Sequence, residues 1–264
     1  MSKPRIKSAQ VLFLIVAVLS TVCLYLSDKY VVPVVMYHSI NDKASPHLQN
    51  ASTVNTEDFR SQMEYLKKNH YSVISLEEYF QGLKANRVFS RKTAVITFDD
   101  GYDDVYTNGF RILKEYGFPA SAFVLPDLVG KDGYMTWAQL KEMKDSGLFE
   151  VESHTLSHPY LPEILADAQR REITLSKKAI ENALGGTVKY FAYPVGGFTD
   201  EVKKMVQEAG YEAAFTTNRG FNRLNKDIYA LKRIRFSNKD NSDRILWAKL
   251  CGYYNFFRQE KPSH

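Results

Sequence analysis

The sequence has few cysteines, little net charge beyond its first residues, and no repeat or low-complexity segment. Only two of its 264 residues are cysteine, and Cys23 lies in an apolar N-terminal run, so an intrachain disulfide with Cys251 is not expected. The net charge of +5 falls to +2 when Lys3, Arg5 and Lys7 are set aside, since 32 basic residues then face 30 acidic ones. This near balance gives no reason to expect a nucleic acid as the partner.

Long apolar runs are absent except at the N-terminus. Val11–Leu26 is almost entirely apolar, follows a basic leader without acidic residues, and with its flanks approaches the about 20 residues of a membrane-spanning helix. The basic flank predicts a cytoplasmic N-terminus and an exported remainder. We therefore expect residues 1–30 to be a leader and transmembrane signal anchor, and residues 31–264 to be one extracellular domain. Secretion after signal cleavage is the alternative, although Leu26-Ser27-Asp28 makes a poor cleavage site.

The remaining residues alternate short apolar runs with amphipathic segments. Strands are expected near residues 31–37, 94–98, 120–125, 149–152, 188–192, 211–216 and 231–236, and helices near 57–69, 105–116, 166–184 and 200–208, with further helices opened by the capping boxes Ser75–Glu78 and Thr136–Gln139. This alternation predicts an α/β fold with a mainly parallel sheet covered by helices. An open doubly wound sheet and a closed barrel both fit, and the number and length of the strands favour the barrel.

Two acidic residues stand directly after a predicted buried strand. Ala94–Phe98 is an apolar run rich in β-branched residues, and Asp99, Asp100 and a glycine follow it. Adjacent carboxylates repel each other and are costly to bury unless a cation lies beside them. A solvated turn is the alternative for an isolated Asp-Asp-Gly sequence.

Two of only six histidines lie close together, in the sequence His154-Thr155-Leu156-Ser157-His158. Two imidazoles and an acid from another strand end give the three protein ligands of a catalytic zinc site, which keeps its fourth position open. One of the tandem carboxylates can ligate the metal while the other accepts a proton from the attacking water. Two surface histidines are the alternative. The segments after parallel strands share one rim, where we also expect His38 and Tyr193.

These residues resemble the motifs of the polysaccharide deacetylases, or family-four carbohydrate esterases. Thr97–Gly101 resembles the first motif, His154–His158 the second, and Tyr193-Pro194-Val195-Gly196 the third. Met36-Tyr37-His38 and Met135-Thr136-Trp137 resemble the branch that removes N-acetyl groups from exported poly-N-acetylglucosamine. The resemblance covers about residues 34–236.

The resemblance implies a distorted (β/α)7 barrel that hydrolyses N-acetyl groups of a polysaccharide and releases acetate. Asp100, His154 and His158 would hold a divalent metal, with Zn²⁺ favoured and Co²⁺, Ni²⁺ or Fe²⁺ as alternatives. Asp99 would be the general base, and the backbone N–H of Val195 would help to hold the oxyanion.

Two features of the family pattern are missing. The late strand reads Leu231-Lys232-Arg233-Ile234, without the histidine that usually serves as general acid, and no arginine precedes the third motif. We predict that His38 is the general acid and that Arg233 orients Asp99. A structural role for His38 and a surface role for Arg233 are the alternatives.

The expected partner is an extracellular polysaccharide, and the sequence implies no protein partner. Tyr193 and Trp137 are predicted to contact the sugar, with simple packing as the alternative for each. Poly-β-1,6-N-acetylglucosamine is the favoured substrate, and peptidoglycan or a chitin-like chain is the alternative. Two other classes stay open: a non-catalytic, surface-anchored carbohydrate-binding protein and an amidohydrolase acting on a small amide.

Overall fold

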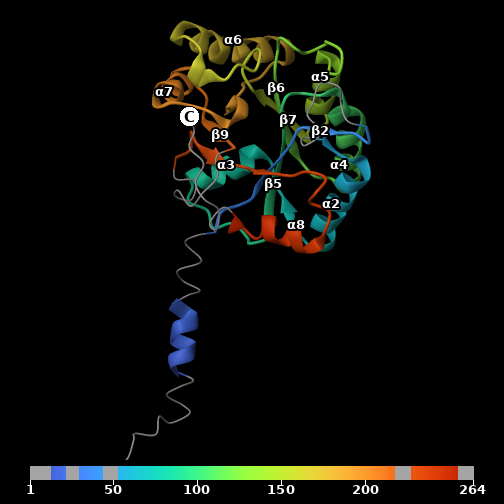
Figure 1. Cartoon of the computed structure of the whole chain (residues 1–264), viewed down its shortest axis with the longest axis vertical. Coiled ribbons are helices and arrows are strands. Elements are labelled where there is room, and N and C mark those ends of the chain that lie inside the picture. Colours follow the sequence, from blue (N-terminus) through green and yellow to red (C-terminus); the bar gives the residue numbers. More distant parts are fainter. Residues whose placement is uncertain (1–12, 22–29, 44–52, 218–226, 255–264) are drawn as a thin grey trace, which may run out of the picture.

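A parallel sheet curves around on itself, and helices cover its outside (Figure 1). The computed structural model describes residues 13–21, 30–43, 53–217 and 227–254. The sheet has the strand order β10-β9-β8-β7-β6-β5-β1-β11. Its strands are β1 (Val34–Tyr37), β5 (Thr93–Phe98), β6 (Ala120–Val124), β7 (Phe149–Ser153), β8 (Tyr190–Ala192), β9 (Ala213–Thr216), β10 (Leu231–Lys232) and β11 (Ile234–Arg235). β4 (Ser72–Val73) joins the start of β5, and β2 (Ser39–Ile40) pairs separately with β3 (Thr53–Val54).

One short segment brings the two edges of the sheet together. β10 pairs with β9 whereas β11 pairs with β1, and Arg233 alone separates the two strands. The N–H of Arg233 donates to the carbonyl of Thr216 (3.2 Å), and the N–H of Phe236 donates to the carbonyl of Met36 (3.0 Å). The sheet is therefore a nearly closed parallel barrel, which confirms the predicted barrel and rules out the open doubly wound sheet.

The helices follow the strands in the expected alternation. They are α2 (Thr56–Lys68), α3 (Leu76–Lys84), the π-helix η1 (Val105–Phe110) continuing into α4 (Arg111–Tyr116), α5 (Trp137–Asp145), α6 (Ala166–Leu184), α7 (Asp200–Glu208) and α8 (Asp243–Leu250), with short 3₁₀ turns η2 (Leu161–Glu163) and η3 (Pro194–Gly196). The capping box that opens α5 is present as predicted. Only half of the other box forms, because Ser75 caps the N–H of Glu78 while the Glu78 carboxylate pairs with Arg87.

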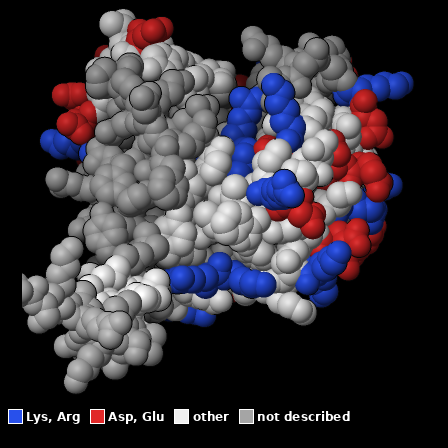
Figure 2. All heavy atoms as spheres, turned by 60° about the horizontal axis from the view of Figure 1, so that its bottom comes forward, with Lys and Arg blue, Asp and Glu red and all other residues white. Residues whose placement is uncertain are grey.

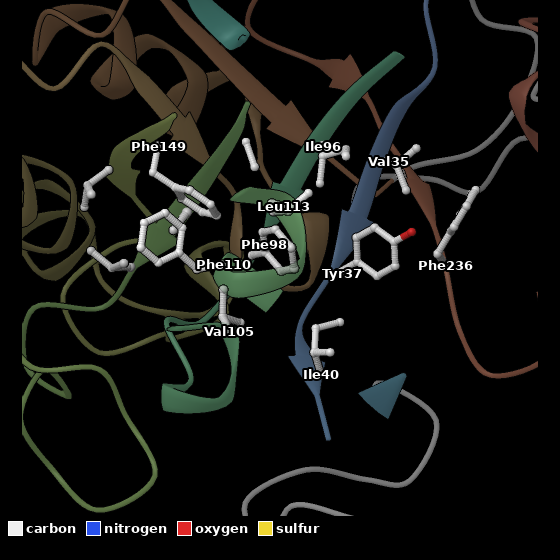
Figure 3. Close-up of a cluster of buried hydrophobic side chains, with 14 of the residues drawn as sticks. Val35, Tyr37, Ile40, Ile96, Phe98, Val105, Phe110, Leu113, Phe149 and Phe236 are labelled. Atoms are coloured by element: carbon white, nitrogen blue, oxygen red, sulfur yellow. The ribbon is translucent and has the colours of Figure 1, made fainter. Parts of the chain in front are cut away.

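Side chains alternate between two apolar layers, as the pleat of a strand requires. The outer layer lies between sheet and helices, and Figure 3 shows part of it, with Phe98, Phe110 and Phe149 in contact. The inner layer includes Val95 of β5, together with side chains of α3, which packs against it. Side chains point to the same side at every second residue, so Thr97 and Asp99 follow Val95 toward the inside of the barrel.

The predicted transmembrane helix is not confirmed. Residues 13–21 form a helix with exposed apolar side chains, placed below the barrel in Figure 1. Within the described ranges, no helix has both the length and the apolar character needed to span a bilayer. The rest of the apolar run, residues 11–12 and 22–26, lies outside the described residues.

Candidate active site

The polar residues that follow the strands meet at the carboxyl end of the barrel. The pairing of β1 with β5 puts His38 beside Asp99, whose N–H donates to the carbonyl of Tyr37 (3.0 Å). His154 follows β7, and its N–H donates to the carbonyl of Val124 on β6 (3.0 Å). The shared rim expected from the sequence is therefore present.

Three potential ligand atoms converge at this rim. Asp100 Oδ1 lies 3.5 Å from His154 Nε2 and 3.6 Å from His158 Nε2. The ligand atoms of these three residues all lie within 4.8 Å of one another. His154 Nδ1 is 2.7 Å from the carbonyl of Ala192, which can only accept, so Nδ1 carries the proton and Nε2 presents a lone pair.

The chemistry of this cluster fits a divalent cation. Asp100 Oδ1 is buried and has no hydrogen-bond partner among the described residues. Burial raises the pKa of Asp100, and the negative charge of Asp99 raises it further. A buried carboxylate oxygen without a hydrogen-bond partner, facing the lone pair of His154 Nε2, is unfavourable on its own. One cation would satisfy all three atoms, and one oxygen with two imidazole nitrogens is a donor set that zinc accepts.

Backbone strain is concentrated at the same place. Six non-glycine residues of the described chain have a positive φ, and four of them belong to the three motifs: Asp100 (72°), Thr155 (72°), His158 (68°) and Val195 (57°). Such conformations persist only where surrounding contacts enforce them. Glu172 of α6 supplies some of these contacts, because its carboxylate accepts the N–H groups of Leu156 (2.8 Å) and Ser157 (3.0 Å). The sequence carried no signal for Glu172.

Arg233 holds the neighbouring carboxylate with both arms of its guanidinium. Nη1 lies 2.6 Å from Asp99 Oδ1, and Nη2 lies 2.6 Å from Asp99 Oδ2. Both residues are buried. The predicted contact is therefore present, and a surface role for Arg233 is wrong. Asp99 Oδ2 is also 3.9 Å from His154 Nε2, so this carboxylate borders the three-ligand cluster.

The charge of Arg233 keeps Asp99 ionised. Burial alone would raise the pKa of Asp99, but the attraction of Arg233, with further help from the histidines, outweighs it and lowers the pKa to about 2. Burial also lowers the pKa of His154 to about 3. His154 is therefore neutral near pH 7, which leaves Arg233 as the cation that stabilises the Asp99 carboxylate there.

The segment that carries His38 is fixed by residues that the sequence analysis missed. The Ser39 hydroxyl donates to Asp104 Oδ2 (2.5 Å), the N–H of Ile40 donates to Asp104 Oδ1 (3.0 Å), and Asn108 donates to the carbonyl of Ile40 (2.7 Å). Asp104 is the N-cap of the π-helix and Asn108 lies within it, and such helices are rare elements often found at functional sites. His38 Nδ1 is buried without a hydrogen-bond partner in the described structure, and burial lowers the pKa of His38.

The predicted sugar contacts are not supported equally. Tyr193 is fully buried and its hydroxyl donates to the carbonyl of Tyr229 (3.0 Å), so it packs, and its predicted role at the sugar is corrected to packing. Trp137 is half-buried against the outer layer and keeps part of its ring accessible at the start of α5. Val195 is 61% exposed at the tight turn that follows β8. A fully buried ring could not be recognised from the motif alone.

We expect Gly196→Ala to destabilise the turn that presents Val195. Gly196 has a φ of +80°, and an added Cβ would meet the Thr217 side chain and come within 2.6 Å of the Thr217 backbone nitrogen. The combined strain should lower the free energy of unfolding by about 3 kcal/mol in denaturant titrations. Gly210 is the matched control, because its φ is +78° with nothing within 4 Å of an added Cβ, so Gly210→Ala should cost only about 1 kcal/mol. Equal losses for the two variants would contradict the steric argument.

The protein is a parallel α/β barrel with a candidate metal-binding cluster at the carboxyl end of its strands. Comparisons with known proteins identify its family. Residues 86–214 match the family described as Polysaccharide deacetylase. A Bacillus subtilis protein named "Putative polysaccharide deacetylase YxkH" is 33% identical over 205 residues, which cover 78% of this chain and 71% of that protein. The poly-beta-1,6-N-acetyl-D-glucosamine N-deacetylase of Staphylococcus aureus is 27% identical over 207 residues, covering 74% of this chain and 71% of the relative.

Solved structures agree with this assignment. The Streptococcus pyogenes deacetylase PplD, solved in complex with acetate, superposes with a TM-score of 0.76 at 30% identity, covering 83% of this chain and 97% of that one. The chain therefore belongs to the polysaccharide deacetylase family, whose members are hydrolases that act on amide bonds. The family resemblance drawn from the three motifs is thus confirmed.

Proposed function

We propose that this polysaccharide deacetylase is a metal-dependent enzyme that removes N-acetyl groups from an extracellular polymer of N-acetylglucosamine. The observation that carries the proposal is the convergence of Asp100, His154 and His158 beside the Asp99–Arg233 pair. Poly-β-1,6-N-acetylglucosamine is the favoured polymer. The name of the Staphylococcus aureus relative and the early Met36-Tyr37-His38 sequence both support this choice.

Each residue at the rim has a separate task in the proposed reaction. Asp99 accepts a proton from the attacking water, and Arg233 holds both of its oxygens in place. The N–H of Val195 donates to the oxygen of the acetamide as that oxygen gains negative charge. His38 then donates a proton to the departing nitrogen, because an amine cannot leave as a bare anion.

The low pKa of Asp99 explains why a cation belongs in this mechanism. A carboxylate with a pKa of about 2 is ionised near neutral pH but is a weak base. Asp100, His154 and His158 would hold a divalent metal, and the metal would supply Lewis acidity toward the water and the acetamide carbonyl. Zn²⁺ suits the donor set best, and Co²⁺, Ni²⁺ and Fe²⁺ are alternatives.

Acetate release from three polymers tests this function directly. The full-length protein should release acetate faster from poly-β-1,6-N-acetylglucosamine than from chitin oligomers or peptidoglycan. Chelation should abolish the release, and Zn²⁺ or Co²⁺ should restore it. Faster release from another polymer would contradict the proposed substrate. Release that persists after exhaustive chelation would contradict the proposed metal dependence. Polymer binding without release from any polymer would favour the non-catalytic carbohydrate-binding alternative.

The mode of action of Arg233 can be tested with two substitutions. Arg233→Lys keeps the charge but loses the planar fork that contacts both Asp99 oxygens, so we expect kcat to fall roughly 10- to 100-fold with metal content unchanged. Arg233→Met also removes the charge. Burial would then raise the pKa of Asp99 unopposed, and because Asp99 acts only when ionised, the acidic limb of the pH–rate profile should move to higher pH. Wild-type kcat in both variants would contradict the role.

We also propose where the protein acts. Residues 1–30 form a cytoplasmic leader and a membrane anchor, and residues 31–264 form the catalytic domain on the outer face of the cell. The basic, acid-free leader before the apolar run Val11–Leu26 supports this orientation. Secretion after cleavage of the leader is the alternative, and the molecular mass of the mature protein in the membrane fraction distinguishes the two.

A further inference from the structure

We propose that the amino-terminal end of the barrel docks on an anionic membrane surface, so that the active site faces away from the bilayer. This inference rests on the proposed membrane anchor. The docking face comprises the ends of three segments: Lys67 and Lys68 of α2; Arg87, Val88, Arg91 and Lys92 before β5; and Arg244, Ile245 and Trp247 of α8. All nine side chains are exposed.

The chain enters the barrel through this face. The hydroxyl of Tyr30 donates to the carbonyl of Ser90 (2.9 Å), and the N–H of Val31 donates to the carbonyl of Gly252 (3.0 Å). The ring of Tyr30 also contacts that of Tyr253, with centroids 6.0 Å apart. Tyr30 is thus held between the segment before β5 and the segment after α8.

The apolar run ends close to this point. Leu26 is its last residue, four positions before Tyr30. A fully extended chain rises by at most ~3.6 Å per residue, so Leu26 lies within roughly 14 Å of Tyr30. An anchor formed by Val11–Leu26 would therefore bring the bilayer surface to within reach of the side chains around Tyr30.

Apolar side chains on the docking face are exposed without an evident structural reason. Val88 is 94% exposed, Trp247 is 63% exposed and Ile245 is 39% exposed. α8 buries Leu246 and Leu250 on its opposite side, so it is anchored to the body while Trp247 faces outward. Tryptophan favours the interface between water and lipid, where its ring contacts acyl chains and its N–H reaches the headgroups.

Basic residues surround these apolar side chains. Lys67 and Lys68 lie in the last turn of α2, and the Nζ of Lys92 donates to the carbonyl of Asn69 (2.7 Å), which joins this helix end to the segment before β5. Acidic residues close to these positions are fewer: Glu64 in the second half of α2, Glu78 of α3, which pairs with Arg87, and Asp243 of α8. Figure 2 turns the side with α8 forward and shows Lys and Arg across its middle, with most Asp and Glu toward the edges. Such a surface matches anionic lipid headgroups.

The proposed orientation has a consequence for the substrate. β5 contains six residues, and at ~3.3 Å per residue it separates the docking face from Asp99 by about 20 Å. The open rim would then point away from the membrane, toward a polymer that lies outside the bilayer rather than toward a lipid-linked sugar at its surface.

Tryptophan quenching in vesicles tests the docking face with the full-length chain. The sequence has only two tryptophans, so Trp137→Phe leaves Trp247 as the reporter, and Trp247→Phe leaves Trp137 at the rim as the matched control. The chain is reconstituted into vesicles of phosphatidylglycerol and phosphatidylcholine, with or without lipids brominated in their acyl chains. Because an interfacial indole reaches the acyl chains, Trp247 emission should fall roughly twofold with brominated lipids, and Trp137 emission should not change.

A charge reversal tests the electrostatic part. In the Trp247 reporter background, Lys67→Glu with Lys68→Glu should reduce the quenching, as should vesicles of phosphatidylcholine alone. Lys178→Glu, on the exposed side of α6 at the other end of the molecule in Figure 1, should leave the quenching unchanged. A chain that fails to float with vesicles would overturn the anchor and the docking face together. If the chain floats but Trp247 is not quenched, the docking face is wrong and the anchor stands. If Trp247 is quenched equally with neutral lipids and in the charge-reversed variant, the preference for an anionic surface is wrong.

Discussion

Asp99→Asn should lower kcat for acetate release by roughly 10³-fold, within the range measured when general bases are removed from other enzymes. Asparagine has nearly the same shape as aspartate but cannot accept a proton from water at neutral pH. The substitution also removes one of the two acceptors that Arg233 contacts. Because Asp99 is not among the three converging ligand residues, the variant should keep its full metal content.

Rate and metal content must be measured together in this experiment. Asp103→Asn is the matched control, since it makes the same chemical change four positions further along, at an exposed side chain. We expect that control to retain kcat within about twofold, as surface substitutions usually do. A fully active Asp99→Asn enzyme would show that Asp99 is not the base, and loss of its metal would show that Asp99 is a ligand instead.

His38→Ala should lower kcat for the polysaccharide by roughly 10²- to 10³-fold, and the size of the loss should depend on the leaving group. The nitrogen of an amide needs a proton in order to depart, whereas 4-nitrophenolate leaves without one. Hydrolysis of 4-nitrophenyl acetate by the variant should therefore stay near the wild-type rate. This comparison separates proton donation from damage to the site, which would slow both substrates.

The pH dependence provides a second readout for His38. Burial lowers the pKa of His38, with Asp100 and Asp99 acting in the opposite direction. A general acid works only while protonated, so wild-type activity should fall as pH rises through this pKa, and the variant should lack that limb. His70→Asn is the control, because His70 is exposed and far from the motifs in sequence, and asparagine tolerates its φ of 57°. If His38→Ala lowered kcat equally for the polysaccharide and for 4-nitrophenyl acetate, proton donation by His38 would be contradicted.

Sequence patterns predicted the barrel and the shared rim because both depend on local features. Apolar runs followed by polar residues mark where strands end, and parallel strands all end at one edge. This was sufficient to place the tandem carboxylates and the histidine pair at one rim, and the family resemblance then implied that Asp100 is the ligand that joins His154 and His158. The contact between Arg233 and Asp99 was also predicted correctly, because Arg233 was expected at the end of a late strand and the usual arginine was missing.

Features that depend on side-chain direction could not be predicted. Asp104 directly precedes the π-helix and contacts Ser39 and Ile40, and sequence periodicity gives no sign either of these contacts or of the wider turn that follows. Tyr193 points into the body rather than the cleft, where its hydroxyl meets the carbonyl of Tyr229. The two-residue strands that close the barrel are too short to show a period at all.

Zinc titration of the metal-free, full-length protein tests most directly whether one carboxylate and two imidazoles bind a divalent ion. Calorimetry should show one equivalent of Zn²⁺ bound by the wild type and by Asp99→Asn. Asp100→Asn, His154→Gln and His158→Gln should each lose that binding, because each removes one of three converging ligand atoms. Zinc binding that is unchanged in all three ligand variants would contradict the metal site and the mechanism built on it.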